Sequence, residues 1–239
     1  MPFSQARQEF CVDFVRGLYY ALKRIEPGRE RKALRKESKI GAALAAVIDI
    51  VTAGLLWLLC SLPLITIGAA SSALYYVVVK CIRHERGRLV KSFFAAFRRD
   101  FKSATLLWLV FLAAALILSA DIYAVGRMGS GNVLGTVGKI LLLALLAFFP
   151  WVFAFVSRFS NTVSGTLKYC GYLALRNIGT TLLMTIELLA FALIVWLMPP
   201  LVFILPGLVC LLLSLHIERV FRPITAEMST ADGDDWFNE

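Results

Sequence analysis

CSLPLITIGAASSALYY, residues 60–76, interrupts a long apolar stretch with a proline, a glycine and several small residues. The surrounding run, residues 40–79, is about twice as long as one membrane-spanning helix requires. Basic residues stand at both of its ends, Lys39 and Lys80, and the positive-inside rule places both ends on the cytoplasmic side. The chain must therefore reverse near Pro63, so the stretch predicts the outer corner of a tight membrane hairpin.

Four residues form the candidate hairpin and packing motif: Pro63, Thr66, Gly68 and Ser72. Pro63 suits the first turn of the returning helix, where its missing N–H is no loss. Gly68 and Ser72, four residues apart, give that helix a small face that a neighbour can approach closely. A tight corner without a polar loop is expected to be tucked into the protein. An anion or a sugar hydroxyl bound at the helix N-terminus is the less favoured alternative.

The composition predicts an all-α polytopic membrane protein. Of 239 residues, 59% are hydrophobic and 17% are charged, and the mean hydropathy is +0.75. The apolar runs predict about six membrane spans. Their approximate bounds are residues 40–62, 63–80, 104–120, 140–156, 180–198 and 199–215.

The charge distribution predicts the orientation of these spans. Alternating the six spans puts twenty-three Lys and Arg residues on one side and two, Arg127 and Lys139, on the other. By the positive-inside rule both termini are cytoplasmic. The net charge of +9 is then a topology signal with some attraction for anionic lipid, and nucleic-acid binding is not expected.

Residues 89–102, LVKSFFAAFRRDFK, predict an amphipathic helix with aromatic side chains on one face and cations on the other. We expect it to lie in the membrane interface, with the aromatics towards lipid. Steadying the bundle is the favoured role, and docking of a cytoplasmic partner is the alternative. The candidate docking residues are Phe93, Phe94, Phe97, Arg98, Arg99, Asp100 and Phe101.

The two ends of the chain are assigned to the cytoplasm. Residues 1–39 form a basic arm with a second amphipathic helix, residues 40–217 form the bundle, and residues 218–239 are expected to be a flexible tail. A shift of 77 residues places Lys91 on Lys168 and Asp100 on Asn177. This faint repeat suggests two copies of a span, a basic helix and a second span.

Few residues suggest chemistry. Phosphate-loop, zinc-protease and nucleophile-elbow motifs are absent from the sequence, so neither an enzyme nor a cofactor is expected. The histidines, His84 and His216, are interpreted as solvated residues at span ends. The five cysteines have no metal-ligand spacing and are interpreted as apolar fillers, and no metal site is expected.

Asp49 and Glu187 form the candidate intramembrane polar site, because each lies inside a predicted span and carries a costly charge. They could line a polar path or meet a cation on another subunit. The favoured alternative is structural, with protonation or hydrogen bonds to hydroxyls such as those of Thr52 and Thr185.

Residues 55–110 resemble the YesL-like family of bacterial integral membrane proteins, a family of unknown function. The resemblance rests on Leu62-Pro63, Thr66-Ile67-Gly68, Ala73-Leu74-Tyr75 and the segment FFAAFRRDFKSATLLW, residues 93–108. Many relatives carry Asn at the position of Gly54, so no role of that Asn is carried over. The resemblance implies no catalytic residues. It implies a genetic context beside carbohydrate ABC importers and polysaccharide-degrading enzymes of Gram-positive bacteria.

Three functions follow from these observations, in descending order. The first is an accessory or regulatory membrane subunit of a carbohydrate ABC importer, which contacts the permease or nucleotide-binding subunits through residues 89–102. The second is a self-standing transporter or channel that uses Asp49 and Glu187. The third is a membrane enzyme acting on lipid or lipid-linked sugar, which lacks a convergent set of reactive groups.

Overall fold

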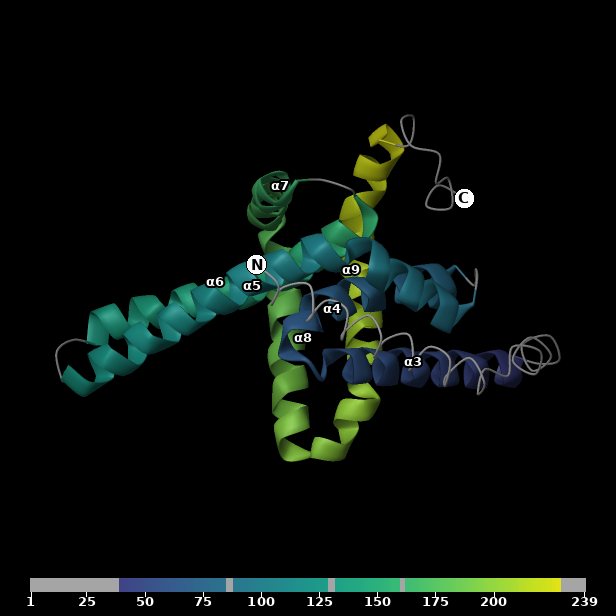
Figure 1. The fold of residues 1–239 in the computed structure, drawn as a ribbon, viewed down its shortest axis with the longest axis horizontal. Helices are drawn as coiled ribbons and strands as arrows, with labels where there is room; N and C mark the ends of the chain where they lie inside the picture. Colours follow the sequence, from purple (N-terminus) through teal and green to yellow (C-terminus); the bar gives the residue numbers. More distant parts are fainter. Residues whose placement is uncertain (1–38, 85–87, 129–131, 160–161, 229–239) are drawn as a thin grey trace, which may run out of the picture.

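The computed structural model describes residues 39–84, 88–128, 132–159 and 162–228, and the regular structure in these residues is helical (Figure 1). The predicted all-α fold is confirmed. The helix expected in residues 1–38 and the last residues, 229–239, lie outside the described part. The elements are α3 (Lys39–Ser61), η1 (Leu64–Thr66), α4 (Ile67–Val77), η2 (Val78–Arg83), α5 (Leu89–Met128), α6 (Asn132–Arg158), α7 (Val163–Arg176), α8 (Ile178–Leu197), η3 (Pro199–Phe203) and α9 (Leu205–Met228).

Within the described residues, five helical segments are long and apolar enough to cross a membrane. They contain α3, α4 with η2, α5, α6 and α8, which match the first five predicted spans. The sixth predicted span, 199–215, is not among the five. It comprises the 3-10 turn η3, at the two prolines Pro199 and Pro200, and the first half of α9.

The helices form two long hairpins around a central helix. Helices α5 and α6 run side by side and extend to the left in Figure 1, whereas α8 and α9 form a second hairpin that runs in a different direction. Helix α3 crosses this second hairpin and packs on α9. The central element is α4, because 72% of its span, Leu64–Arg83, is buried, against 11% of the α8 span.

The predicted hairpin corner lies between α3 and α4. Thr66 is buried, and its hydroxyl lies 2.5 Å from the carbonyl oxygen of Cys60 and 2.7 Å from that of Pro63. The indole of Trp108 on α5 donates a hydrogen bond of 2.7 Å to the Leu64 carbonyl. These bonds satisfy the backbone of the turn, as a corner at membrane depth requires.

Two details of the corner differ from the prediction. Pro63 precedes the returning helix, because its ψ of 109° is extended and a 3-10 turn separates it from α4. The side chains of Leu62 and Leu64 are 67% and 70% exposed, so the corner is not tucked into the protein. Because the backbone of this turn is hydrogen-bonded within the protein, its apolar surface can face lipid and does not need to be covered by other helices.

The predicted interfacial helix, 89–102, and the third span are one continuous helix. Helix α5 has 40 residues, about 60 Å at 1.5 Å per residue, which is twice the thickness of a bilayer core. By contrast, the helix is interrupted at Asn177, between α7 and α8. The 77-residue shift places Asn177 on Asp100, which lies inside the continuous helix α5. The two proposed repeat copies therefore differ in their connection.

The expected interfacial placement of the aromatic face of residues 89–102 is wrong. Phe93, Phe94 and Phe97 are at most 5% exposed, because this face packs on the protein rather than on lipid. The rings also contact one another, with centroids 6.3 Å apart for Phe93 and Phe97 and 5.5 Å apart for Phe97 and Phe101. Hydrophobic periodicity reports an apolar face, but it does not report whether protein or lipid covers that face.

The prediction started the flexible tail too early, at residue 218. Helix α9 continues to Met228, and residues in its second half are buried, including Ile217, Glu218 and Phe221. These residues continue the face that begins at Cys210 and Ser214, with the three- and four-residue spacing of a helix.

Gly68 is where α4 and α5 approach most closely. A Cβ atom at Gly68 would come within less than 3.0 Å of the Ala104 carbonyl oxygen and the Trp108 side chain. A Cβ atom at Gly207 would likewise meet the Ile50 carbonyl where α9 crosses α3. At the small face predicted around Gly68, α5 fills the space at the start of α4.

We expect Gly68→Ala to destabilise the protein by about 1–3 kcal/mol, because the added methyl group must push backbone apart. The midpoint of thermal unfolding in detergent, followed by circular dichroism, measures this change. Gly126→Ala is the control. Gly126 lies on α5, the helix that packs against Gly68, but nothing lies within 4 Å of a Cβ added at Gly126. Equal midpoints for the two variants would contradict the close approach.

Candidate functional site

Polar side chains from four helices meet at the C-terminal end of α6, and we call this group the polar cluster. It consists of Ser72 and Tyr75 on α4, Arg99 and Asp100 on α5, Ser157 and Arg158 on α6, and Glu218 on α9. All of these residues except Arg99 are nearly fully buried. Buried polar groups at a junction of helices make this the candidate functional site.

One half of the polar cluster joins α4, α5 and α6. The Ser72 hydroxyl donates to the Asp100 carboxylate at 3.0 Å. Arg99 donates to the same carboxylate through two nitrogens, at 2.8 and 2.9 Å, and its guanidinium also donates to the Ser157 carbonyl at 2.8 Å. The guanidinium of Arg99 lies over the Tyr76 ring, 4.9 Å from its centroid. Asp100 is therefore an internal anchor.

The other half joins α4, α6 and α9. The Tyr75 hydroxyl donates to Glu218 Oε1 at 2.8 Å, and Arg158 forms an ion pair with Glu218 Oε2. The side chains of Arg158 and Glu218 are only 4% and 8% exposed. Nearby, Arg83 donates to the Ser214 carbonyl on α9 at 3.0 Å.

The polar cluster is electrically balanced, and this limits its chemistry. Each carboxylate, Asp100 and Glu218, has one arginine and one hydroxyl donor as partners. Both carboxylates are therefore engaged within the protein rather than turned towards a substrate. Within the described ranges, no group of three or more possible metal ligands occurs. The arrangement is suited to holding four helices in register.

Asp49 and Glu187, the predicted intramembrane pair, are placed on different helices and both are partly buried. Glu187 on α8 contacts His216 on α9, with Glu187 Oε1 2.9 Å from His216 Nε2. His216, interpreted as a solvated residue at a span end, keeps 25% of its side chain exposed and also pairs with Glu187, because α9 extends past it beside α8. The hydroxyls suggested as partners of the pair, Thr52 and Thr185, instead donate to the carbonyls of Ile48 and Thr181 on their own helices.

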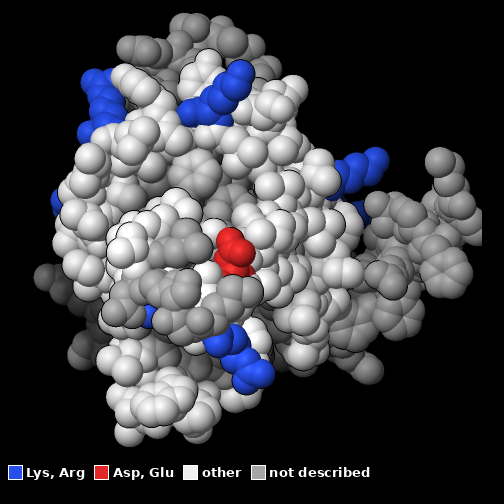
Figure 2. Space-filling view, turned by 90° about the vertical axis from the view of Figure 1, so that its left-hand side faces the viewer, with Lys and Arg blue, Asp and Glu red and all other residues white. Residues whose placement is uncertain are grey.

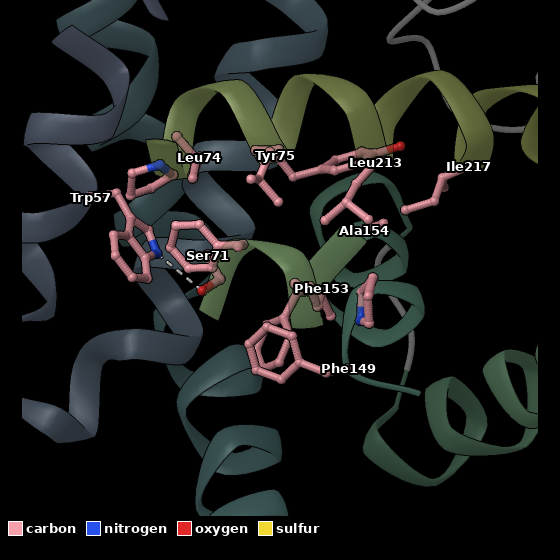
Figure 3. A pocket seen from close by; sticks show the side chains of 15 residues that line it. Trp57, Ser71, Leu74, Tyr75, Phe149, Phe153, Ala154, Leu213 and Ile217 are labelled. Atoms are coloured by element: carbon pink, nitrogen blue, oxygen red, sulfur yellow. Dashed lines mark hydrogen bonds between the residues drawn. The ribbon is translucent and has the colours of Figure 1, made fainter. Parts of the chain in front are cut away.

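An apolar crevice of about 150 Å³ lies between α8, α9 and the central helices (Figure 3). Its walls come from α3, α4, α6, α8 and α9, and neither Asp49 nor Glu187 is among them. A hydrogen bond of 3.1 Å from the Trp57 indole to the Ser71 hydroxyl crosses one side. The lining residues are Trp57, Ser71, Leu74, Tyr75, Phe149, Pro150, Phe153, Ala154, Leu188, Phe191, Pro206, Val209, Cys210, Leu213 and Ile217.

Four cysteines in the described residues are free and buried, Cys60, Cys81, Cys170 and Cys210. Cys170, on α7 outside the spans, donates weakly to the Trp151 carbonyl at 3.5 Å. Burial raises the pKa of the Cys170 thiol to about 12, so the thiol stays protonated at neutral pH. This supports the interpretation of the cysteine as an apolar filler rather than a nucleophile.

The predicted docking residues separate into two groups. Phe93, Phe94, Phe97 and Asp100 are buried and cannot meet a partner, and Phe101 is half-buried. The exposed side of the same helix carries Lys91, Arg98 and Lys102, and we call these three residues the basic stripe. Beyond it, the exposed side of α5 becomes apolar, with Leu106 51% exposed. This change from cations to apolar residues marks where α5 enters lipid.

The opposite end of the α5–α6 hairpin has a different surface. Figure 2 views the molecule from the side on which this hairpin projects, and most of the surface is uncharged, with Lys and Arg in separate groups. Exposed apolar residues along both helices, such as Leu116, Ile117 and Ile140, agree with contact with lipid.

Sequence reasoning missed the role of Glu218, which it placed at the start of the flexible tail, residues 218–239. The helical spacing of Cys210, Ser214, Ile217, Glu218 and Phe221 was the signal, since it places Glu218 on an apolar face. A charge on such a face requires a buried partner. Arg158 is that partner.

The helices and spans define a polytopic α-helical membrane protein. Residues 50–122, from α3 through the hairpin corner and α4 into α5, match a family model described as Protein of unknown function, DUF624. The match confirms the family resemblance in this region and is consistent with the YesL-like family. No curated protein and no solved structure shows a significant match to the chain.

We expect Arg158→Met to destabilise the protein by about 3–5 kcal/mol, because Glu218 would keep a buried charge without its cation. The double variant Arg158→Met with Glu218→Gln should be less unstable than Arg158→Met alone. Chemical unfolding in detergent measures both. Arg127→Met, an exposed control at the far end of α5, should change stability by less than about 0.5 kcal/mol. A double variant less stable than Arg158→Met would contradict the ion pair.

The Glu187–His216 contact should appear as an energetic coupling. A double-mutant cycle with Glu187→Gln and His216→Leu is expected to give about 0.6–1.7 kcal/mol, the range of hydrogen bonds between membrane helices. Asp121→Asn replaces Glu187→Gln in a control cycle, since Asp121 lies near the far end of α5 and should not couple to His216. Equal coupling in the two cycles would show that the contact does not form.

Proposed function

We propose that this chain is an accessory integral membrane subunit of a carbohydrate ABC importer, without catalytic activity of its own. It would bind an importer subunit at the cytoplasmic face through the basic stripe of α5. The family resemblance supplies the context, since relatives are commonly encoded beside such importers. The observation that carries the proposal is an exposed row of cations on a helix whose opposite face is buried.

The basic stripe has a defined shape. Lys91, Arg98 and Lys102 are seven and four residues apart, so they lie on one side of α5 over about 16 Å. On the other side, Phe93 and Phe97 are at most 3% exposed. A helix held by its buried face loses little conformational freedom when a partner binds, which favours association.

The charge of the basic stripe indicates the chemistry of the partner. Arg99 is already joined to Asp100 and Ser157, whereas the three stripe residues are exposed around the outer side of the helix. Cations in this arrangement attract an acidic protein surface and set the register and rate of association. The importer's permease or nucleotide-binding subunits are the proposed carriers of that surface, at the side of the membrane where ATP is hydrolysed.

The self-standing transporter remains the weaker candidate. It predicts a polar path that reaches Asp49 and Glu187, whereas the apolar crevice touches neither residue and Glu187 is joined to His216. The third candidate, an enzyme acting on lipid, lacks support from the polar cluster, whose two carboxylates each have an arginine and a hydroxyl as partners.

Affinity purification from the native host in mild detergent tests the accessory role. We expect importer subunits to accompany the tagged protein, and the variant Lys91→Glu, Arg98→Glu, Lys102→Glu to recover at least about ten-fold less of them. The control is Arg127→Glu with Lys139→Glu, two exposed cations at the other end of the α5–α6 hairpin. Its recovery should equal that of the unmodified protein.

Two results would contradict the proposal. If no importer subunit accompanies the unmodified protein, the chain is not an importer subunit. If the charge-reversed variant recovers as much as the control, the basic stripe is not the contact. Equal amounts of the variants in the membrane, measured by immunoblot, ensure that the comparison reports binding.

A further inference from the structure

The apolar crevice is unusual in position and in lining. Its floor consists of buried residues, including Leu74, Phe153 and Ile217, so it reaches the centre of the helix packing. Its rim includes the partly exposed residues Leu188 and Phe191 of α8, so it opens where the α8–α9 hairpin lies against the rest of the protein. A site with a closed floor and an open rim can admit a ligand from outside.

The shape of the crevice is elongated. Its wall on α9 runs from Pro206 to Ile217, about 16 Å along the helix axis. In Figure 3, Leu213 and Ile217 project from α9 on the side of Phe153 and Ala154 of α6. The volume of about 150 Å³ limits how much of a ligand the crevice can hold.

The surroundings of the crevice identify what can enter it. The helices that form the rim include membrane-spanning segments, so the medium at the opening is hydrocarbon. The atoms that line an empty apolar space lack dispersion contacts on that side, and a bound hydrocarbon chain supplies these contacts. A cavity of about 150 Å³ holds a molecule of the size of benzene, which corresponds to about six carbon atoms of a chain.

We propose that the apolar crevice binds the end of one unbranched acyl chain of a membrane phospholipid. The small volume, about 150 Å³, favours a methylene chain over a methyl-branched polyprenyl chain, because the methyl branches need more room for the same length of chain. The driving force is close packing, since lipid tails are as apolar as the walls and transfer from bilayer to crevice yields little hydrophobic free energy. The site is therefore selective for chain shape rather than for the lipid headgroup.

Photo-cross-linking in a bilayer tests this assignment. The full chain is reconstituted in phosphatidylglycerol nanodiscs that contain a phosphatidylglycerol with a diazirine near the end of one acyl chain, and adducts are mapped by mass spectrometry. We expect adducts on floor residues such as Phe153 and Cys210, in addition to adducts on the outward-facing residues of α8. Adducts on outward-facing residues alone would overturn the proposal.

Two filling variants and one control make the test specific. Ala154→Phe fills the floor and Leu188→Trp narrows the partly exposed rim, where a larger side chain is tolerated. Each should lower the floor adducts at least about ten-fold and leave the outward-facing adducts unchanged. Ala192→Phe adds a ring on the exposed side of α8 and should leave the floor adducts unchanged. Floor adducts that persist in Leu188→Trp would overturn the site.

A second probe distinguishes the source of the chain. A polyprenyl phosphate with a diazirine near its chain end is supplied in place of the phospholipid probe. We expect it to label outward-facing residues and to leave the floor unlabelled. Floor labelling by the polyprenyl probe and not by the phospholipid would overturn the proposal of an unbranched chain. This outcome is independent of importer binding, which does not require the crevice.

Discussion

The close approach of α4 and α5 at Gly68 is the constraint on which the rest of the structure depends. In a bilayer, helices gain little from the hydrophobic effect and associate by packing, which a small residue permits. Because Gly68 has no Cβ, α4 packs directly against Ala104 and Trp108 of α5. Helix α4 therefore lies at the centre of the protein, with the first part of α5 in contact with it. The aromatic side chains of residues 93–97 then become core rather than an interfacial face, and the opposite cations are left exposed.

The same contact explains where the buried charges lie. Once α5 is pressed on α4, Asp100 comes within hydrogen-bonding distance of Ser72, and Tyr75, three residues further along α4, reaches Glu218 on α9. A helix with hydroxyls on one face therefore meets two carboxylates from two neighbours. Two arginines balance the two carboxylates: Arg99 on α5 pairs with Asp100 and donates to the Ser157 carbonyl on α6, and Arg158 on α6 pairs with Glu218. Without them the burial of these carboxylates would be strongly unfavourable.

The sequence predicted the features that depend on length and on local composition. Five of the six predicted spans, the reversal near Pro63 and the close approach at Gly68 follow from such local signals, and all three are present in the described residues. The features that it missed depend on what covers a face. Periodicity marked residues 89–102 as amphipathic, but it could not distinguish lipid from α4 as the neighbour. Glu218 was assigned to the tail and His216 to a span end because the predicted span ended before the helix did.

The arrangement of contacts also explains why a crevice persists in a tightly packed protein. Near the end of α6, the α8–α9 hairpin is held by the Arg158–Glu218 ion pair and by Arg83 at the Ser214 carbonyl. Along α9, from Ile217 back to Pro206, the contacts across the crevice are almost entirely apolar and impose no fixed geometry. Gly207 then fixes the other end by its close approach to α3. Helix α9 is therefore fixed at its Glu218 end and at Gly207, with apolar side chains between these two points. It cannot move closer to α6 without breaking one of these contacts, so the crevice between α9 and α6 remains.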